Sequence, residues 1–193
     1  MENLEKKIFE AASTGDVYLL KTLLKQDPLI LDRVSLNNLT ESPLHVATIL
    51  GHADFVNEIL MISPRLAGEV NSQRSTPLHL ASGNGHVDIV RALLNVDPGL
   101  CTARDKNGFT PLHLAAVKGR VEVLKVLVEK KPDAALISAY RGETILHLCV
   151  RYNQLEALKV LVRAEYGPEL VNAKDDEGNT VLHLAVADKQ VEV

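Results

Sequence analysis

A six-residue string repeats along this chain at an almost fixed interval. Thr-Pro-Leu-His-Leu-Ala occurs at residues 76–81 and again at residues 110–115. Variants of the string begin at Ser42, Thr144 and Thr180, so successive copies lie 34, 34, 34 and 36 residues apart. A regular period of this length is typical of repeat proteins, in which each unit packs only against its neighbours. With 193 residues in total, the chain leaves no room for a second kind of domain.

Each repeat reads as a pair of helices. Thr110 is a favourable N-cap, and Pro111 suits the first helical position, where its missing N–H costs nothing. Gly119 follows the string by four residues, where a left-handed residue ends a helix. Apolar residues then recur at helical spacing over residues 121–129, which predicts a second helix with one buried face. A Pro ends that helix, and we expect an extended stretch with a turn before the next string.

A degenerate copy of the string at residues 8–12, followed by Gly15, extends the pattern toward the N-terminus. One helix pair buries too little apolar surface to fold alone, whereas stacked pairs share a continuous core. We therefore predict an all-α solenoid of helix-turn-helix units, forming one domain over residues 1–193. The predicted units are approximately 1–36, 37–70, 71–104, 105–138, 139–174 and an incomplete 175–193.

The repeated strings, at this period, resemble ankyrin repeats over essentially residues 4–193. The resemblance implies a non-enzymatic solenoid with β-turn fingers that binds another protein or a peptide. Pro-containing outer loops, such as residues 97–100, lengthen the units. Loops of this style resemble the ankyrin region of plant membrane-anchored proteins with a C-terminal PGG domain. That narrower resemblance implies a role in defence or salt-stress signalling.

Four residues depart from the repeat pattern at turns. Asn153 and Lys189 replace the glycine between the two helices, and Asn tolerates a left-handed conformation better than Lys. Arg74 and Thr40 stand where other units have a glycine in the β-turn before the string. We expect those two turns to be altered.

Composition excludes several classes of protein. The net charge of −4 gives no overall basic excess for nucleic acid. No apolar run approaches the 18 residues of a membrane span, and the charged N-terminus does not resemble a signal peptide. Residues 104–163 nevertheless carry 11 Lys and Arg against 6 Asp and Glu. This basic middle favours an acidic partner or an anionic lipid surface, or it reflects random scatter on solvated helix faces.

The histidines and cysteines are explained by the repeat. His52 and His86 follow turn glycines, and the other five histidines belong to the string: His45, His79, His113, His147 and His183. In the family the string His is a buried hydrogen-bonding post between repeats. Cys149 occupies a small core position, and Cys101 is expected in a partly exposed loop. We expect the acidic residues 175–177 to be a solvated turn. No catalytic residue, metal site or cofactor is predicted.

Family contacts are made by the turn tips and by the residues that precede the turn glycine. Carried over to this chain, the predicted partner-binding residues are Leu39, Ile49, Leu50, Gln73, Asn84, Lys106, Phe109, Lys118, Tyr140, Arg141, Arg151 and Tyr152. The rings of Phe109, Tyr140 and Tyr152 beside basic residues have the composition of an interface hot spot for a carboxylate- or phosphate-bearing segment. The alternative is that these rings pack onto adjacent turns and stiffen them.

The expected function is that of a protein-interaction scaffold or adaptor in signalling, and the expected location is the cytoplasm. The resemblance to the plant group implies defence or stress signalling. Two other classes stay open. One is the cytosolic regulatory region of a membrane protein whose spans lie beyond residue 193, and the other is an enzyme that uses these repeats for targeting. Membrane contact is expected only through a region absent from this chain, and nucleic acid is not an expected partner.

The last residues of the chain predict an interrupted unit. Residues 191–193 match the start of a second helix at residues 121–123. We therefore expect the chain to be a fragment. Without the outer helix, the apolar face of residues 182–186 is expected to be exposed, and residues 182–193 to fray or pair with another molecule.

Overall fold

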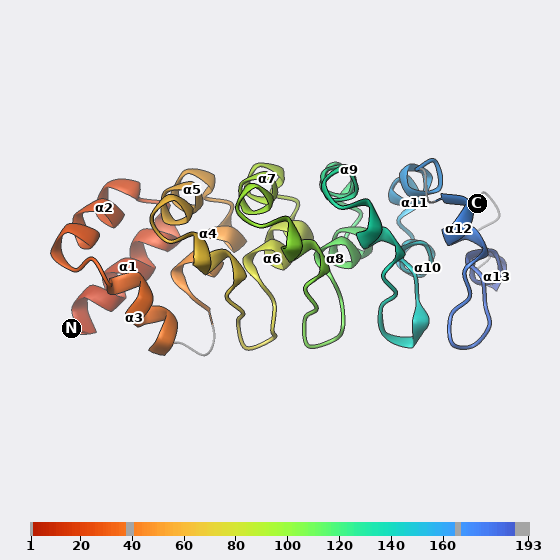
Figure 1. Ribbon diagram of the computed structural model, residues 1–193, viewed down its shortest axis with the longest axis horizontal. Helices are drawn as coiled ribbons and strands as arrows, with labels where there is room; N and C mark the ends of the chain where they lie inside the picture. The colour runs from red at the N-terminus through yellow and green to blue at the C-terminus, as the bar shows by residue number, and fades with distance from the viewer. Residues whose placement is uncertain (1, 38–40, 165–166, 188–193) are drawn as a thin grey trace.

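The computed structural model describes residues 2–37, 41–164 and 167–187. Its helices form two parallel rows that run along the length of the molecule (Figure 1). Loops extend from one side of the inner row. Within the described residues every regular element is a helix. The predicted all-α solenoid is therefore confirmed.

The rows are formed by alternate helices. The inner row contains α1 (Glu2–Thr14), α4 (Pro43–Leu50), α6 (Pro77–Asn84), α8 (Pro111–Val117), α10 (Ile145–Arg151) and α13 (Val181–Ala187). The outer row contains α2 (Val17–Gln26), α5 (Ala53–Ile62), α7 (Val87–Val96), α9 (Val121–Lys130) and α11 (Leu155–Val162). Among the described residues no helix is long and apolar enough to cross a membrane.

A continuous aliphatic core separates the rows. The Leu of the repeated string is fully buried in four consecutive units, at Leu44, Leu78, Leu112 and Leu146. Each outer helix presents one apolar face to it, as Leu93 does from α7. Because each unit contributes the same positions, the core extends from one end of the array to the other without a boundary.

The turns between paired helices follow the sequence prediction. Gly119 has a φ of 63°, and a Cβ added there would overlap the Gln154 side chain. Asn153 takes the same left-handed conformation at the equivalent place, with a φ of 53°. Arg74 also adopts a left-handed φ of 57°, so its turn keeps the glycine conformation and the prediction of an altered turn is wrong. Thr40 and Lys189 lie outside the described residues.

The segments after the outer helices differ from the prediction. Instead of an extended stretch, the chain forms short 3-10 helices at η1 (Pro64–Gly68), η2 (Pro98–Thr102) and η3 (Pro132–Leu136), and short α-helices at α3 (Ile30–Asn37) and α12 (Gly167–Asn172). The fixed φ of Pro ends one helix but suits the first residue of another. Cys101 lies in η2 and is fully buried, so its expected exposure is wrong. Burial raises the pKa of the Cys101 thiol to about 11 and that of Cys149 to about 12.

Side chains at the helix-to-helix turns connect each unit to the preceding one. His52 Nε2 donates to the carbonyl of Ser13 at 2.9 Å, and His86 Nε2 to that of Ile49 at 3.1 Å. Arg120 Nε donates to Gly83 O at 3.1 Å. The next equivalent residue, Gln154, is an exception because its amide donates to Tyr152 O within its own unit.

At the C-terminal end of the array, α13 leaves apolar side chains exposed. Leu182 is 51% and Val186 80% exposed, as the interrupted unit predicted. Residues 188–193 lie outside the described part of the chain. The expected fraying or pairing of this end stays a prediction.

Candidate functional site

Four described fingers precede the repeated strings. We call residues 71–75, 105–109, 139–143 and 175–179 fingers, because each forms a closed five-residue turn. In every finger the N–H of the first residue donates to the carbonyl of the fifth, as Asp105 does to Phe109 at 2.9 Å.

A side-chain cap stabilises three of these fingers. Asp105 Oδ1 accepts hydrogen bonds from Asn107 N at 2.8 Å and Phe109 N at 2.9 Å. Asn71 and Asp175 accept the equivalent pair of bonds. The fourth finger begins with Ala139, whose methyl group cannot accept a hydrogen bond. This finger therefore lacks the cap that the other three share.

The uncapped finger has a different backbone. Arg141 and Gly142 are both left-handed, with φ values of 65° and 68°. In the finger 105–109 only Gly108 is left-handed. A left-handed conformation costs a residue with a Cβ about 1–2 kcal/mol. The structure thus places an arginine at a strained position of finger 139–143.

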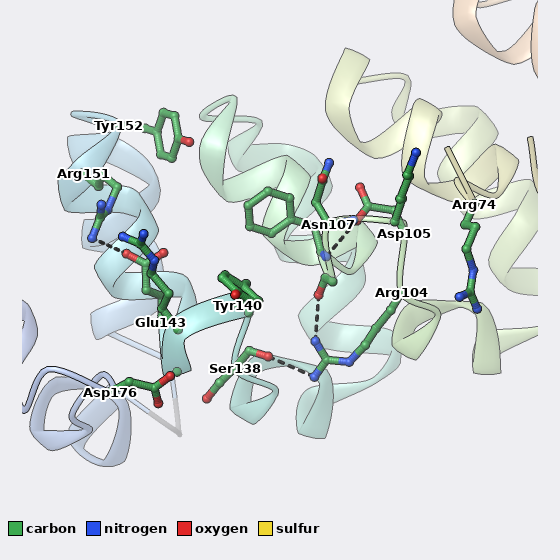
Figure 2. A pocket seen from close by; sticks show the side chains of 16 residues that line it. Arg74, Arg104, Asp105, Asn107, Ser138, Tyr140, Glu143, Arg151, Tyr152 and Asp176 are labelled. Atoms are coloured by element: carbon green, nitrogen blue, oxygen red, sulfur yellow. Dashed lines mark hydrogen bonds and ion pairs between the residues drawn. The ribbon is translucent and has the colours of Figure 1, made fainter. Parts of the chain in front are cut away.

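The fingers 105–109 and 139–143 form the walls of an open groove of about 1140 Å³ (Figure 2). We call it the finger groove. It brings together six of the twelve predicted partner-binding residues: Lys106, Phe109, Tyr140, Arg141, Arg151 and Tyr152. The lining also contains ten residues outside those twelve, and the charged or polar ones among them are Arg74, Arg104, Asp105, Asn107, Ser138, Glu143 and Asp176.

Positive charge predominates in the finger groove. Its lining contains five cationic side chains, two of which are held by neighbours. Arg151 Nη2 lies 2.5 Å from Glu143 Oε1, and the Arg104 guanidinium donates to two main-chain carbonyls. The side chains of the other three cations have no hydrogen bond or ion pair within the described residues: Arg74, Lys106 and Arg141. These three are available to an anionic ligand.

The aromatic residues of the groove differ in exposure. Tyr140 is 74% and Tyr152 is 46% exposed. Phe109 is partly buried and less exposed than either tyrosine, and its ring centroid lies 6.1 Å from that of the buried His113. Phe109 thus packs against its own unit, whereas both tyrosines are exposed to solvent.

Comparison with known families agrees with this geometry. The sequence matches the family model described as ankyrin repeats (3 copies) over residues 59–138 and again over residues 132–193. The chain belongs to the ankyrin-repeat family. Ankyrin repeats are a non-enzymatic fold for protein–protein interaction, so the chain is a protein-interaction module. No curated protein matches it.

The string histidines of these ankyrin repeats hold the fingers in place. The Thr110 N–H donates to His113 Nδ1 at 3.0 Å, so the ring proton sits on Nε2, which donates to Ile137 O at 2.9 Å. His79 and His147 donate in the same way to Phe109 O and Asn179 O, the last carbonyls of two fingers. Each buried string His therefore fixes the segment that begins the following repeat.

Burial explains the titration of these groups. Desolvation lowers the pKa of His113 to about 4 and also lowers the pKa values of His45 and His79. The last string histidine, His183, is exposed, and within the described residues it bonds only to Thr180. Nor do the described residues contain a group of three His, Cys, Asp or Glu side chains that could hold a metal ion.

The other predicted binding residues lie outside the finger groove. Ile49 and Leu50 are exposed at the end of α4, while Asn84 and Lys118 are exposed at the ends of α6 and α8. Gln73 lies in the preceding finger and bonds through its carbonyl to Lys106 N. Leu39 lies outside the described residues. The structure therefore does not gather all twelve residues into one site.

Proposed function

We propose that the finger groove binds a segment of a partner protein that carries carboxylate or phosphate groups, and that the chain serves as an adaptor in signalling. The observation that carries this proposal is that one groove is lined by two exposed tyrosines and by three cationic side chains that make no hydrogen bond or ion pair among the described residues. Arginine forms bidentate hydrogen bonds with carboxylates and phosphates. Exposed aromatic rings with neighbouring arginines are the usual composition of binding hot spots.

The groove is suited to binding because much of it is fixed before a partner arrives. The carbonyl of Phe109 is held by His79, and Asp105 caps the same finger. Across the groove, Arg104 Nη2 donates to Ser138 O at 2.9 Å. A surface that is ordered in advance loses little conformational entropy on binding, so more of the contact energy appears as affinity.

A peptide-selection experiment tests this proposal. The purified chain is used to select binders from a random peptide library, and their affinities are measured for the double variant Tyr140→Ala, Tyr152→Ala. Loss of two hot-spot rings is expected to weaken binding at least about 30-fold, which corresponds to about 2 kcal/mol. The melting temperature should stay nearly unchanged because both rings are exposed.

Tyr18→Ala is the matched control. Tyr18 is 81% exposed but lies on α2, at the N-terminal end of the array, whereas the groove fingers precede α8 and α10 (Figure 1). It should leave peptide affinity unchanged. Failure to select any peptide, or equal affinities for the double variant and the wild type, would refute the assignment of this groove.

The cellular setting is a further part of the proposal. From the resemblance of its Pro-containing outer loops to the plant membrane-anchored group, we propose that the module acts in the cytoplasm, at the cytosolic face of a membrane. Plant defence or stress signalling is the corresponding context. The full-length reading frame tests this: apolar spans after residue 193 support it, whereas a catalytic domain there favours an enzyme that uses the repeats for targeting.

A further inference from the structure

Neighbouring fingers are joined by a main-chain hydrogen bond that recurs at equivalent positions. The second residue of one finger donates its N–H to the carbonyl of the third residue of the preceding finger. Lys106 N bonds in this way to Gln73 O at 2.8 Å, and Asp176 N bonds to Arg141 O at 3.0 Å. The lateral bond therefore joins the first two and the last two of the four described fingers.

The two fingers that form the groove lack this bond. The equivalent donor and acceptor are the N–H of Tyr140 and the carbonyl of Asn107, and within the described residues neither makes a hydrogen bond. Both residues line the groove. The connection is made instead by Arg104, whose Nη1 donates to Gly108 O at 2.7 Å and whose Nη2 donates to Ser138 O (Figure 2).

We call the boundary between fingers 105–109 and 139–143 the seam. The absence of the cap at Ala139 explains why the main-chain bond is missing there. Without an Asx oxygen to draw in the N–H groups of the third and fifth residues, finger 139–143 takes two left-handed residues in succession. The finger then no longer pairs with residues 105–109 as the capped fingers pair with their neighbours.

We propose that an extended, acidic peptide segment of the partner lies in the groove across the seam between these two fingers. One of its N–H groups donates to the carbonyl of Asn107, and one of its carbonyls accepts from the N–H of Tyr140. As in strand addition to a sheet edge, main-chain bonds then supply affinity and side chains supply selectivity. Asp or Glu side chains of the segment lie near Lys106 and Arg141, whose side chains make no hydrogen bond or ion pair among the described residues.

The inference rests on the proposed function and adds that the groove recognises the main chain of the partner through hydrogen bonds. It therefore predicts that closing the seam removes binding without removing any ligand-contacting side chain. Asn71 shows that Asn caps a finger without adding charge, since its Oδ1 accepts from Gln73 N at 3.0 Å and Ser75 N at 2.9 Å. Ala139→Asn supplies the same cap to the groove.

The test uses the acidic peptides selected on the wild-type chain. Ala139→Asn should lower their affinity at least about tenfold while the melting temperature rises or stays constant. Val70→Asn places the same side chain one position before the cap of finger 71–75, at an exposed residue outside the groove, and should leave the affinity within about twofold. If both variants bind as tightly as the wild type, the inference is wrong.

A second measurement is made on the wild-type protein, so it does not depend on how a variant folds. Methylation of one particular peptide nitrogen should abolish binding, and the Tyr140 amide should exchange its hydrogen more slowly in the complex. If no single N-methyl group matters and the Tyr140 amide is unaffected, the peptide is recognised by side chains alone. In that case the tyrosine double variant still loses binding and the proposed function stands. If the double variant binds normally, the proposed function itself fails.

Discussion

Replacement of His113 by Ala should remove a connection on which two repeats depend. Its ring is fully buried and accepts from the Thr110 N–H through Nδ1. Through Nε2 it donates to Ile137 O, two residues before the finger that begins the following unit. One side chain thus supports the start of α8 and the segment that leads into finger 139–143.

The cost follows from the groups that lose their partners. Deletion of the ring leaves the buried Thr110 N–H and the partly buried Ile137 carbonyl without these bonds, and a buried orphaned group costs about 1–3 kcal/mol. The cavity left by the ring adds to this loss. We expect a total of about 3–5 kcal/mol, a large part of the about 5–15 kcal/mol that stabilises a typical domain.

Urea unfolding followed by circular dichroism at 222 nm provides the measurement, with His183→Ala as the matched control. His183 occupies the same string position, but it is exposed and within the described residues bonds only to Thr180. Its removal should cost about 1 kcal/mol or less, as for loss of an exposed cap. A loss below about 1 kcal/mol for His113→Ala, or equal losses for both variants, would refute the role of the inter-repeat bond.

Three further outcomes are expected. The pKa of His113 is lowered from 6.5 to about 4, so between these pH values the unfolded chain binds more protons than the folded chain. The free energy of unfolding should therefore fall by up to about 3 kcal/mol as the pH drops from about 6.5 to 4. Urea unfolding at several pH values should show a smaller fall for His113→Ala. Arg74→Gly removes the cost of an arginine in a left-handed conformation and should stabilise the fold by about 1 kcal/mol. Calorimetry should also detect weaker peptide binding, because the groove loses a cation. Unchanged stability would contradict the claim that Arg74 is strained. Gly119→Ala should destabilise by about 1–2 kcal/mol and Asn153→Gly, at the equivalent turn, should stabilise, since both φ values are positive; shifts of the same sign in thermal melts would oppose this explanation.

Much of the fold could be predicted because it is encoded locally and repeated. The Thr-Pro start, the turn glycine and the apolar spacing each predict one structural element, and their recurrence predicts the stacking. The buried Cys101 was missed because Pro98 ends a helix in the sequence pattern, although the same residue begins η2. Three-dimensional packing of that short helix decides the burial of the thiol.

The site was only partly predictable. The spacing located Tyr140, Arg141 and Tyr152, but the open seam depends on a hydrogen bond that no single repeat contains. A signal was present in the aligned fingers, which begin with Asn71, Asp105, Ala139 and Asp175. The single residue without a polar side chain marks the finger whose turn differs.

The exceptional side chain of Gln154 has a mechanical consequence for the whole array. The earlier turn residues His52, His86 and Arg120 each anchor one repeat to the repeat before it, whereas Gln154 bonds within its own unit. At this junction the lateral finger bond is also absent. Under tension we expect the described repeats to separate at this junction, into a longer N-terminal block and a shorter C-terminal block. A ligand that binds both fingers adds contacts across the same junction, so its binding should raise the force needed to separate the two blocks.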